Sequence, residues 1–214
     1  MKKIDIAVVD YGMGNLRSVS KALEHVAAEK NILVTSDPDL IHMAERVVFP
    51  GQGAMPDCIR ELDARGLRAA VMEATKSKPF LGICIGLQML FESSEEGNSL
   101  GLGLLRGKVQ KFAHEDMHDA EGNKLKVPHM GWSEVMQKQS HPLWKDIGNG
   151  ERFYYVHSYY VAPQDKLLVA GVTEYPKVYT CAIARDNLFA VQFHPEKSAA
   201  AGLQLLSNFV NWKP

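Results

Sequence analysis

The fold is indicated most clearly by residues 79–91, which read Pro79-Phe80-Leu81-Gly82-Ile83-Cys84-Ile85-Gly86-Leu87-Gln88-Met89-Leu90-Phe91. The apolar run before Cys84 predicts a buried strand, and the run from Leu87 to Phe91 predicts a helix. Glycines on both sides of Cys84 allow a sharp turn that lifts its side chain above the sheet. A strand that turns in this way into a helix is typical of α/β proteins. The segment therefore predicts an α/β fold with a nucleophile elbow.

The rest of the first half alternates strand patterns with helix patterns. Strands are predicted at 4–9, 32–34 and 46–49, the last one ended by Pro50-Gly51, and helices are predicted at 15–28 and 67–75. Because strands that alternate with helices pair in parallel, we expect a mostly parallel central sheet with helices on both faces.

Short β-rich runs dominate the second half and are separated by turn residues. They cover residues 104–112, 132–136, 152–161, 167–173, 178–185 and 188–193, and a last helix is predicted at 199–212. No repeat, low-complexity tract or linker divides the chain. The sequence therefore predicts one domain over 1–214, in which an antiparallel β extension continues the parallel sheet.

Cys84 has the position of a nucleophile, since the N-terminus of the helix predicted after it favours a thiolate. A thiolate needs a base, and His194 ends a predicted strand in Val191-Gln192-Phe193-His194-Pro195-Glu196. Glu196 could fix the tautomer of His194, so that His194 takes the Cys84 proton and passes it to a leaving amine. The alternative is a small buried Cys84 and a His194 that belongs to a surface turn.

A glycine-rich loop follows the third predicted strand as Phe49-Pro50-Gly51-Gln52-Gly53. The N–H groups of Gly51, Gln52 and Gly53 could bind an oxyanion together with the N–H of Ile85, which follows the nucleophile. By itself this segment favours an ordinary Pro-Gly turn. The oxyanion-hole hypothesis therefore depends on the elbow and the base.

The composition argues against several classes of protein. A formal net charge of −1 is unfavourable for nucleic acid as the main partner, since phosphate neutralisation needs clustered Lys and Arg. The chain has three cysteines, an odd number, and they are widely spaced in sequence. This favours a reducing compartment over a disulfide framework. No apolar run approaches the roughly 18 residues of a membrane span, and no signal-peptide pattern is present. We expect a soluble, cytoplasmic chain without membrane contact.

Two further patterns fail as metal or cofactor sites. His114-Glu115-Asp116-Met117-His118 matches the H-E-x-x-H zinc motif, but its segment is rich in charge and poor in apolar residues, which predicts a surface loop. Gly12-Met13-Gly14 follows a strand, but Arg17 stands where a dinucleotide fingerprint needs its third glycine. Cys58 and Cys181 have no base nearby in sequence and are interpreted as structural. We expect no metal and no cofactor.

Three segments resemble, in the same order, the motifs of the triad (class I) glutamine amidotransferases. They are Pro50-Gly51-Gln52-Gly53, Gly82-Ile83-Cys84-Ile85-Gly86 and His194-Pro195-Glu196, and the resemblance covers the whole chain. It implies a flavodoxin-like α/β fold and hydrolysis of glutamine to glutamate and ammonia through a thioester on Cys84, with His194 and Glu196 completing the triad. It also implies that Gln88 and Glu96 hold the amino-acid end of the substrate.

Finer features resemble one branch of this family, the glutaminase subunits of imidazole glycerol phosphate synthases. They are Asp10-Tyr11-Gly12-Met13-Gly14-Asn15, Pro128-His129-Met130-Gly131-Trp132, Tyr155-Val156-His157-Ser158-Tyr159 and His194-Pro195-Glu196-Lys197-Ser198. The branch implies a heterodimer with a β/α-barrel cyclase subunit, which uses the ammonia to make imidazole glycerol phosphate and aminoimidazole carboxamide ribotide in histidine biosynthesis. The resemblance assigns five residues to the contact with the cyclase: Asn15, Met130, Trp132, Tyr154 and Lys197. Gln52 and Ser133 depart from the commonest form of the branch, where valine and asparagine are frequent.

Other functions fit parts of the pattern. A cysteine peptidase or chaperone-like protein on a related elbow fold would not need the complete Pro-Gly-x-Gly and His-Pro-Glu set. A non-catalytic regulatory subunit would tolerate the loss of a triad residue, and here the triad is intact. The glutaminase subunit of anthranilate synthase is the nearest alternative within the family, and the acceptor enzyme that the chain stimulates would distinguish it.

Overall fold

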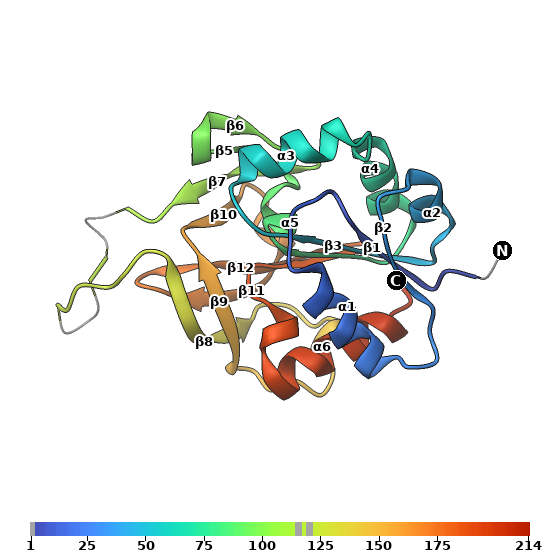
Figure 1. The fold of residues 1–214 in the computed structure, drawn as a ribbon. Coiled ribbons are helices and arrows are strands. Elements are labelled where there is room, and N and C mark those ends of the chain that lie inside the picture. Colours follow the sequence, from blue (N-terminus) through green and yellow to red (C-terminus); the bar gives the residue numbers. More distant parts are fainter. Residues whose placement is uncertain (1–2, 114–116, 119–121) are drawn as a thin grey trace.

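The structure is a computed structural model that describes residues 3–113, 117–118 and 122–214. Its centre is the parallel sheet that the sequence predicts (Figure 1). The strands of this sheet are β1 (Ile6–Val9), β2 (Ile32–Thr35), β3 (Arg46–Gly51), β4 (Phe80–Cys84) and β13 (Leu188–Val191). They pair in parallel in the order β2-β1-β3-β4-β13, so the last strand of the chain lies beside the strand that carries Cys84.

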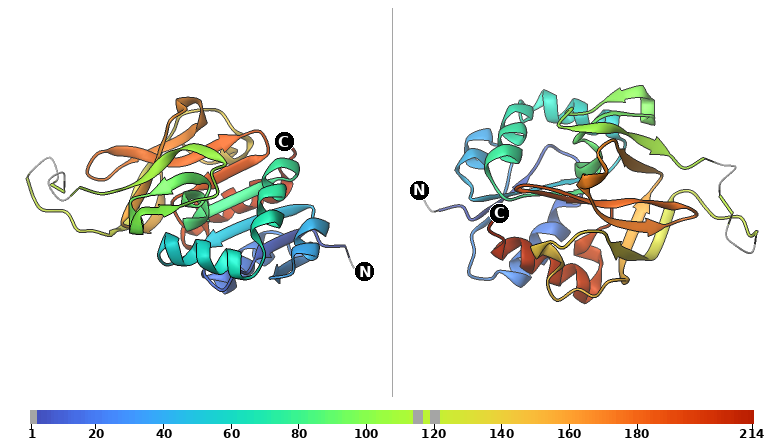
Figure 2. Two further views of the ribbon diagram at one scale, coloured as in Figure 1. Left: turned by 90° about the horizontal axis from the view of Figure 1, so that it is seen from above. Right: turned by 180° about the vertical axis from the view of Figure 1, so that it is seen from behind.

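Helices cover both faces of the parallel sheet (Figures 1 and 2). One face is covered by α1 (Leu16–Val26) and α6 (Ala199–Asn211), which pack against each other, and the other face by α2 (Pro38–Met43), α3 (Met55–Ala64) and α4 (Arg68–Ser77). Burial on both faces explains why β1, β4 and β13 are continuous apolar runs. No helix within the described ranges is both long and apolar enough to cross a membrane.

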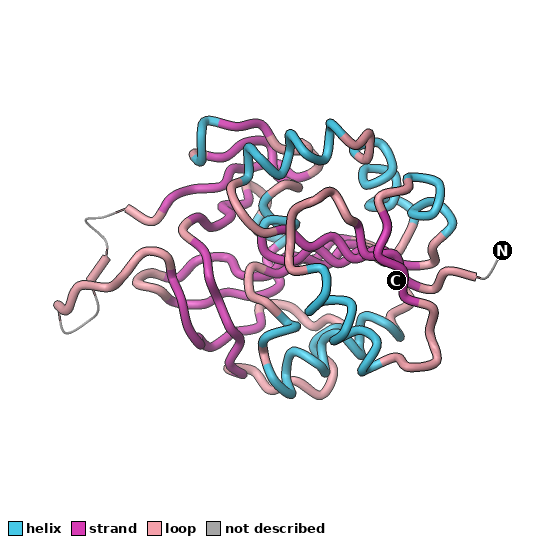
Figure 3. The backbone as a smooth tube through the Cα atoms, viewed as in Figure 1, coloured by secondary structure: helices cyan, strands magenta, loops and turns pink. Residues whose placement is uncertain are grey.

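The chain from β5 onward extends the sheet with mostly antiparallel strands, on the side away from the two termini (Figure 3). The strands are β5 (Phe91–Ser94), β6 (Ser99–Leu100), β7 (Leu105–Lys111), β8 (His129–Gln137), β9 (Glu151–His157), β10 (Tyr159–Pro163), β11 (Val169–Glu174) and β12 (Val178–Arg185). Short 3-10 turns lie between some of them: η1 (Glu96–Asn98), η3 (Pro142–Trp144) and η4 (Lys166–Leu168). A fourth turn, η5 (Pro195–Lys197), lies between β13 and α6. The sheet continues from β13 through β12, β10 and β7, while β11, β8 and β9 branch from β12. The prediction of a parallel sheet with an antiparallel extension is confirmed.

The helix predicted to continue through Phe91 is wrong in length. The structure has only the single turn α5 (Ile85–Gln88), and Phe91 already begins β5. The carbonyl groups of Met89, Leu90 and Phe91 accept backbone hydrogen bonds from the loop at 102–105 instead of from a following helical turn. Tertiary hydrogen bonding therefore overrides the helical preference of this apolar run.

The structure differs from the sequence prediction at other elements as well. β3 does not end before Pro50-Gly51 but continues through both residues, which pair with Ile83 and Cys84. Pro50 has no N–H to donate, yet this costs no ladder bond to β1, whose pairing with β3 ends at Val48. The run at 152–161 is divided between β9 and β10, and the sequence analysis did not predict α2 or α3.

Candidate active site

Three chain segments that are far apart in sequence meet at one edge of the parallel sheet. β4 lies between β3 and β13, with Gly51 paired to Cys84 on one side and Val191 paired to Ile83 on the other. Because the strands are parallel, their carboxyl ends open at the same edge, where ligands of α/β sheets bind. The glycine-rich loop, the elbow and the segment leading to His194 are thus brought together as the sequence predicts.

Cys84 itself carries the strained conformation of the elbow. Its backbone has φ of 56° and ψ of −109°, a region that side chains other than glycine rarely adopt. The flanking glycines serve a different purpose from the one expected, since neither has a positive φ. A Cβ on Gly86 would stand 1.9 Å from the Phe49 carbonyl oxygen, and one on Gly82 would stand 2.9 Å from the Cβ of Ala190. The glycines allow the close packing that holds the strained residue in place.

His194 and Glu196 form a buried pair. The Nδ1 atom of His194 lies 2.9 Å from Oε1 of Glu196, and the two side chains are 6% and 1% exposed. The backbone of His194 is fixed as well. The His194 N–H donates to the Tyr154 carbonyl, and the Ser198 hydroxyl donates to the His194 carbonyl. A carboxylate can only accept, so Nδ1 carries the proton and Nε2 is left for the cavity.

The charge of His194 depends on the nucleophile. Burial would lower the pKa of His194, but a negative charge on Cys84 and the Glu196 carboxylate, which accepts a hydrogen bond from the ring, raise it to about 10. The Nε2 atom is buried and has no hydrogen-bond partner within its own described chain. A negative charge on Cys84 and the Glu196 carboxylate thus favour the protonated form of His194.

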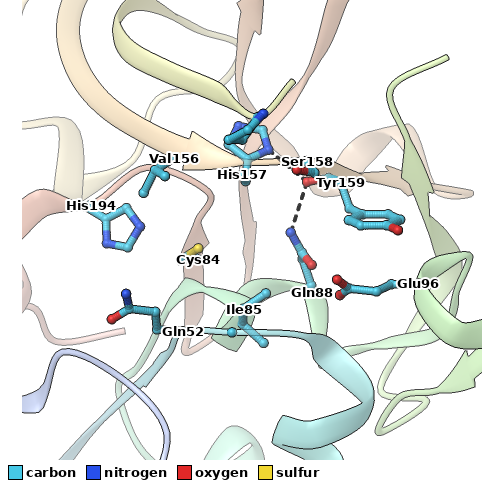
Figure 4. A pocket seen from close by; sticks show the side chains of 12 residues that line it. Gln52, Cys84, Ile85, Gln88, Glu96, Val156, His157, Ser158, Tyr159 and His194 are labelled. Atoms are coloured by element: carbon cyan, nitrogen blue, oxygen red, sulfur yellow. Dashed lines mark hydrogen bonds between the residues drawn. The ribbon is translucent and has the colours of Figure 1, made fainter. Parts of the chain in front are cut away.

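A cavity of about 310 Å³ opens above the nucleophile. Its walls come from the glycine-rich loop, the elbow, η1 and the segment at 156–159, and the lining residues are Gln52, Gly53, Cys84, Ile85, Gln88, Glu96, Pro128, Val156, His157, Ser158, Tyr159 and His194. In Figure 4 the sulfur of Cys84 lies between His194 on one side and Gln88 and Glu96 on the other. The cavity thus has a catalytic end and a second polar end.

Gln88 and Glu96 form the second polar end. The Gln88 side-chain nitrogen donates to the Tyr159 carbonyl at 3.0 Å and to Oε1 of Gln192 at 3.1 Å, and the first of these bonds is the dashed line in Figure 4. The side-chain oxygen of Gln88 is buried and finds no donor in the described chain. Oε2 of Glu96 accepts the Met55 N–H at 2.8 Å. An orphan carbonyl oxygen beside a carboxylate suits a ligand ammonium group.

The glycine-rich loop borders the nucleophile. Gly51 lies inside β3, where a Cβ would stand 2.4 Å from the Tyr11 hydroxyl, and Gly53 has a φ of +109° that favours glycine. Gln52 and Gly53 line the cavity together with Ile85. The Cys58 thiol lies 3.6 Å from the Gln52 carbonyl oxygen, to which it donates. Cys58 is buried, as expected for a structural cysteine, yet it contacts the loop that is expected to bind the oxyanion.

Four of the residues expected at a partner interface lie on β8, β9 and η5, and Met130, Trp132 and Lys197 are exposed there. Met130 is 62% exposed and Trp132 is 43% exposed, both on β8. Trp132 packs edge-to-face on Tyr154, and the Lys197 ammonium lies 6.0 Å from the centre of the Tyr154 ring. Asn15 immediately precedes α1, which contacts η5, the turn that holds Lys197. We call Met130, Trp132, Tyr154 and Lys197 the aromatic patch, and its role as an interface stays a prediction.

The sequence analysis missed a buried hydrogen-bond chain beside the cavity. Nδ1 of His157 lies 2.8 Å from the Tyr159 carbonyl and its Nε2 lies 2.9 Å from the Tyr179 hydroxyl, which lies 2.9 Å from Nδ1 of His129. Nε2 of His129 in turn lies 2.9 Å from the Ser133 hydroxyl. The motifs around His129 and His157 were noticed in the sequence, but a contact with Tyr179 depends on strand register and leaves no local signal.

The donors and acceptors in this series of hydrogen bonds follow from the Tyr159 carbonyl, which can only accept. His157 must donate from Nδ1, so its Nε2 accepts from the Tyr179 hydroxyl. His129 must then donate to Tyr179 and accept from Ser133. Burial lowers the pKa of His129 to about 4, and burial together with the neighbouring charge of His129 lowers the pKa of His157 to about 3. Both rings are therefore neutral at pH 7, as this direction of the hydrogen bonds requires.

Gln192 was also missed. It is fully buried, and its side chain contacts both Gln88 and Cys84. The signal that could have found it is a long polar side chain inside the apolar run at 188–193, two residues before the expected base. Such a buried polar group needs partners, and here the partners belong to the site.

Two patterns that the sequence does not assign to the site are the zinc-like motif and the glycines of the first loop. His114, Glu115 and Asp116 lie outside the described residues. In the part of the chain that the structure describes, no three His, Cys, Asp or Glu side chains are grouped so that they could hold a metal ion. The Gly12 N–H donates to the Asp10 carboxylate at 2.8 Å, and Gly12 has a φ of +83°, as expected for a tight turn.

Comparison with known proteins identifies the family of the chain. Residues 7–212 match the family model described as glutamine amidotransferase class-I. The subunit HisH of imidazole glycerol phosphate synthase from Dechloromonas aromatica is 66% identical over 98% of this chain and 97% of its own length. The same subunit from Thiobacillus denitrificans is 65% identical over 99% of this chain and 92% of its own length.

Solved structures show the same fold at much lower identity. A crystal structure described as a glutamine amidotransferase superposes with a TM-score of 0.70 at 15% identity, covering 96% of this chain and 97% of that one. PurLQS from Thermotoga maritima superposes with a TM-score of 0.67 at 18% identity, covering 98% and 99%. These two likenesses concern the fold alone.

Proposed function

The chain belongs to the glutamine amidotransferase class-I family, and from this premise we propose that it hydrolyses glutamine and delivers the ammonia to the cyclase of an imidazole glycerol phosphate synthase. The observation that carries the proposal is that the buried Cys84 shares one cavity with His194, whose Nδ1 is bound to Glu196 and whose Nε2 has no partner among the described residues. A nucleophile, a base and a group that orients the base are the minimum for acyl transfer.

The first half of the reaction uses the thiolate–imidazolium pair. The sulfur of Cys84 attacks the side-chain amide carbon of glutamine, and the carbonyl oxygen becomes an oxyanion. Nε2 of His194 then gives its proton to the amide nitrogen, the C–N bond breaks and ammonia leaves. A γ-glutamyl thioester remains on Cys84 and His194 is neutral.

The second half restores the enzyme. Neutral His194 takes a proton from water through Nε2, and the resulting hydroxide attacks the thioester carbon. The C–S bond breaks, glutamate leaves and the thiolate forms again beside the imidazolium. Glu196 holds the ring in the tautomer that both steps need, because its Oε1 accepts from Nδ1.

Substrate recognition is assigned to the far end of the cavity. The orphan oxygen of Gln88 and the carboxylate of Glu96 would bind the α-ammonium group of glutamine, with its side chain extended toward Cys84. The N–H groups of the glycine-rich loop and of Ile85 would bind the oxyanion. One such donor supplies about 2.7–4 kcal/mol of transition-state stabilisation.

The acceptor of the ammonia is proposed from the relatives, which are named as subunits of imidazole glycerol phosphate synthase. The aromatic patch adjoins β9, whose Val156 and His157 line the cavity, so a partner seated there would lie close to the released ammonia. We assign the partner as a β/α-barrel cyclase that forms a heterodimer with the chain. It would make imidazole glycerol phosphate and aminoimidazole carboxamide ribotide in histidine biosynthesis.

The test is a glutaminase assay on the purified chain with and without the cyclase subunit and its nucleotide substrate. We expect glutamate formation that rises when both are added, together with synthesis of imidazole glycerol phosphate from glutamine. The matched control is the component I subunit of anthranilate synthase with chorismate. If only that pair stimulates the chain, the acceptor is wrongly assigned. If no combination yields glutamate, the glutaminase activity itself is wrong.

A further inference from the structure

Gln192 bridges the nucleophile and the substrate end of the cavity. Its backbone N–H donates to the Cys181 carbonyl at 2.8 Å, which fixes the residue directly after β13. Its side-chain nitrogen lies 3.7 Å from the sulfur of Cys84 and donates to it. Its side-chain oxygen accepts from Gln88 at 3.1 Å. Gln192 is 0% exposed, Gln88 is 1% exposed and Cys84 is 4% exposed, so water does not compete for these bonds.

The orientation of both amide groups is determined by one carbonyl. Because the Tyr159 carbonyl can only accept, the Gln88 atom that contacts it at 3.0 Å is the NH2 group. The same NH2 group contacts Gln192, whose facing atom must therefore be the oxygen. The NH2 group of Gln192 is then turned toward Cys84. His157 also donates to the Tyr159 carbonyl, which holds this reference point in place.

Two consequences follow for the two ends of the cavity. The sulfur of Cys84 faces an N–H donor that strengthens when the sulfur is a thiolate, since hydrogen bonds to charged groups are the stronger ones. The NH2 group of Gln88 is occupied by the Tyr159 carbonyl and the Gln192 oxygen. The Gln88 oxygen has no donor among the described groups and remains available to a ligand. A single side chain thus couples the state of the nucleophile to the presentation of Gln88.

We propose that Gln192 stabilises the Cys84 thiolate by hydrogen bonding and at the same time positions Gln88 for glutamine. The inference rests on the proposed glutaminase function, because it assigns Gln192 a part in that reaction. The bond to the sulfur predicts that Gln192 influences the ionisation of Cys84, and the bond to Gln88 predicts an influence on the KM for glutamine. A residue that only fills space would affect neither quantity.

The experiment measures both quantities on the chain in complex with its cyclase. The rate of Cys84 alkylation by iodoacetamide is followed against pH, with Cys84→Ser as the blank for the other cysteines, and glutaminase kcat and KM are measured in parallel. Gln192→Met keeps nearly the same volume and removes both polar ends. Losing a hydrogen bond to a charged group should raise the pH midpoint of alkylation by about one unit, and KM should rise several-fold.

Gln192→Glu separates the two bonds. A carboxylate still accepts from Gln88 but offers no hydrogen to the sulfur and adds a negative charge beside it. We expect a larger rise in the alkylation midpoint than for Gln192→Met, with KM close to that of the unaltered chain. The matched control is Gln204→Met on α6, whose amide contacts Asn208 on the same helix, and it should change neither quantity.

The outcomes separate this inference from the proposed function. Midpoints and KM values unchanged in both Gln192 variants, with melting temperatures equal to that of the unaltered chain, would overturn the role of Gln192. Should Gln192→Met fail to fold, Gln192→Leu, which also lacks both polar ends and carries no charge, takes its place. If the unaltered chain hydrolyses no glutamine, the glutaminase proposal fails, while the alkylation profiles still decide whether Gln192 stabilises the thiolate.

Discussion

The Nδ1 atom of His194 lies 2.9 Å from Oε1 of Glu196, although only Pro195 separates the two residues. Pro195 begins the turn η5, which brings the carboxylate back beneath the ring, and both side chains are buried. A base and its orienting group are thus supplied by three consecutive residues. The only long-range requirement is that this turn stands beside the end of β4, which the β13–β4 pairing provides.

Replacing the nucleophile should abolish glutamine hydrolysis and leave the fold intact. In Cys84→Ala no thioester can form, whereas the loss of one sulfur atom at a cavity wall costs little packing. With the cyclase added, the variant should still support synthesis from ammonium salt. Glutaminase turnover and the melting temperature are measured, and turnover within tenfold of the unaltered chain would disprove the assignment of Cys84.

Replacing the base should be more damaging than replacing the group that orients it. His194→Ala removes both the proton acceptor and the proton donor, while Glu196→Gln leaves the ring in place and weakens only its orientation. We expect the loss of kcat/KM to be at least tenfold greater for His194→Ala. A greater loss for Glu196→Gln would mean that the two roles are wrongly assigned.

Acid should destabilise the protein through the buried histidines of the second half. The pKa of His129 is lowered to about 4 and that of His157 to about 3, against an ordinary value of 6.5. As the pH falls below 6.5, both histidines become protonated in the unfolded chain but stay neutral in the folded chain. The free energy of unfolding therefore falls until the pH reaches the folded pKa. Each histidine contributes a slope of about 1.4 kcal/mol per pH unit in that window.

The slope is measured by urea unfolding at several pH values between 7 and 4. The variant His157→Gln lacks the titrating group. The slope of its unfolding free energy against pH should be smaller by about 1.4 kcal/mol per pH unit, whatever its stability at pH 7. His194 is the natural comparison, because its pKa is raised to about 10 and its contribution is lost only as the pH rises from 6.5 toward 10. An unchanged acid slope in His157→Gln would show that this ring is protonated in the folded state.

The isolated chain should be a weak glutaminase that the cyclase activates when the acceptor nucleotide is bound. The Gln52 carbonyl is held by a thiol, which is a weak donor, and Gly53 is free to change its backbone angles, so the loop can move at low cost. A hundredfold activation corresponds to about 2.7 kcal/mol, which one oxyanion donor can supply. Steady-state kinetics on the chain alone, with the cyclase and with nucleotide check this. Full activity of the chain alone would contradict it.

The aromatic patch should carry much of the affinity for the cyclase. Trp132 is exposed and packs on Tyr154, and truncating a central aromatic residue of an interface typically costs about 2 kcal/mol or more, roughly a thirtyfold loss of affinity. Trp132→Ala should show this loss in isothermal titration with the cyclase. Leu167→Ala, at a site on η4 that is 86% exposed, is the control and should bind normally. Equal affinities would place the interface elsewhere.

The local sequence was sufficient to predict much of the protein. Alternation of apolar strand and helix patterns predicted the parallel sheet, because burial on both faces leaves a continuous apolar run in each strand. The turn at Cys84 and the short turn from His194 to Glu196 depend on neighbouring residues only, so their chemistry could be predicted from segments of a few residues. The order of these segments predicted which strand ends would meet.

Only the tertiary structure decided which polar groups satisfy each other across the sheet. Gln88 finds Gln192 at a separation of 104 residues and Tyr159 at 71, and His129 finds Tyr179 at 50. These contacts depend on strand register and on the early end of α5, which the loop at 102–105 imposes by binding the carbonyls of residues 89–91. Periodicity in a sequence reports where a backbone is buried. The partner of a buried polar side chain depends on the three-dimensional path of a second segment, and so does the charge of His194 beside Cys84.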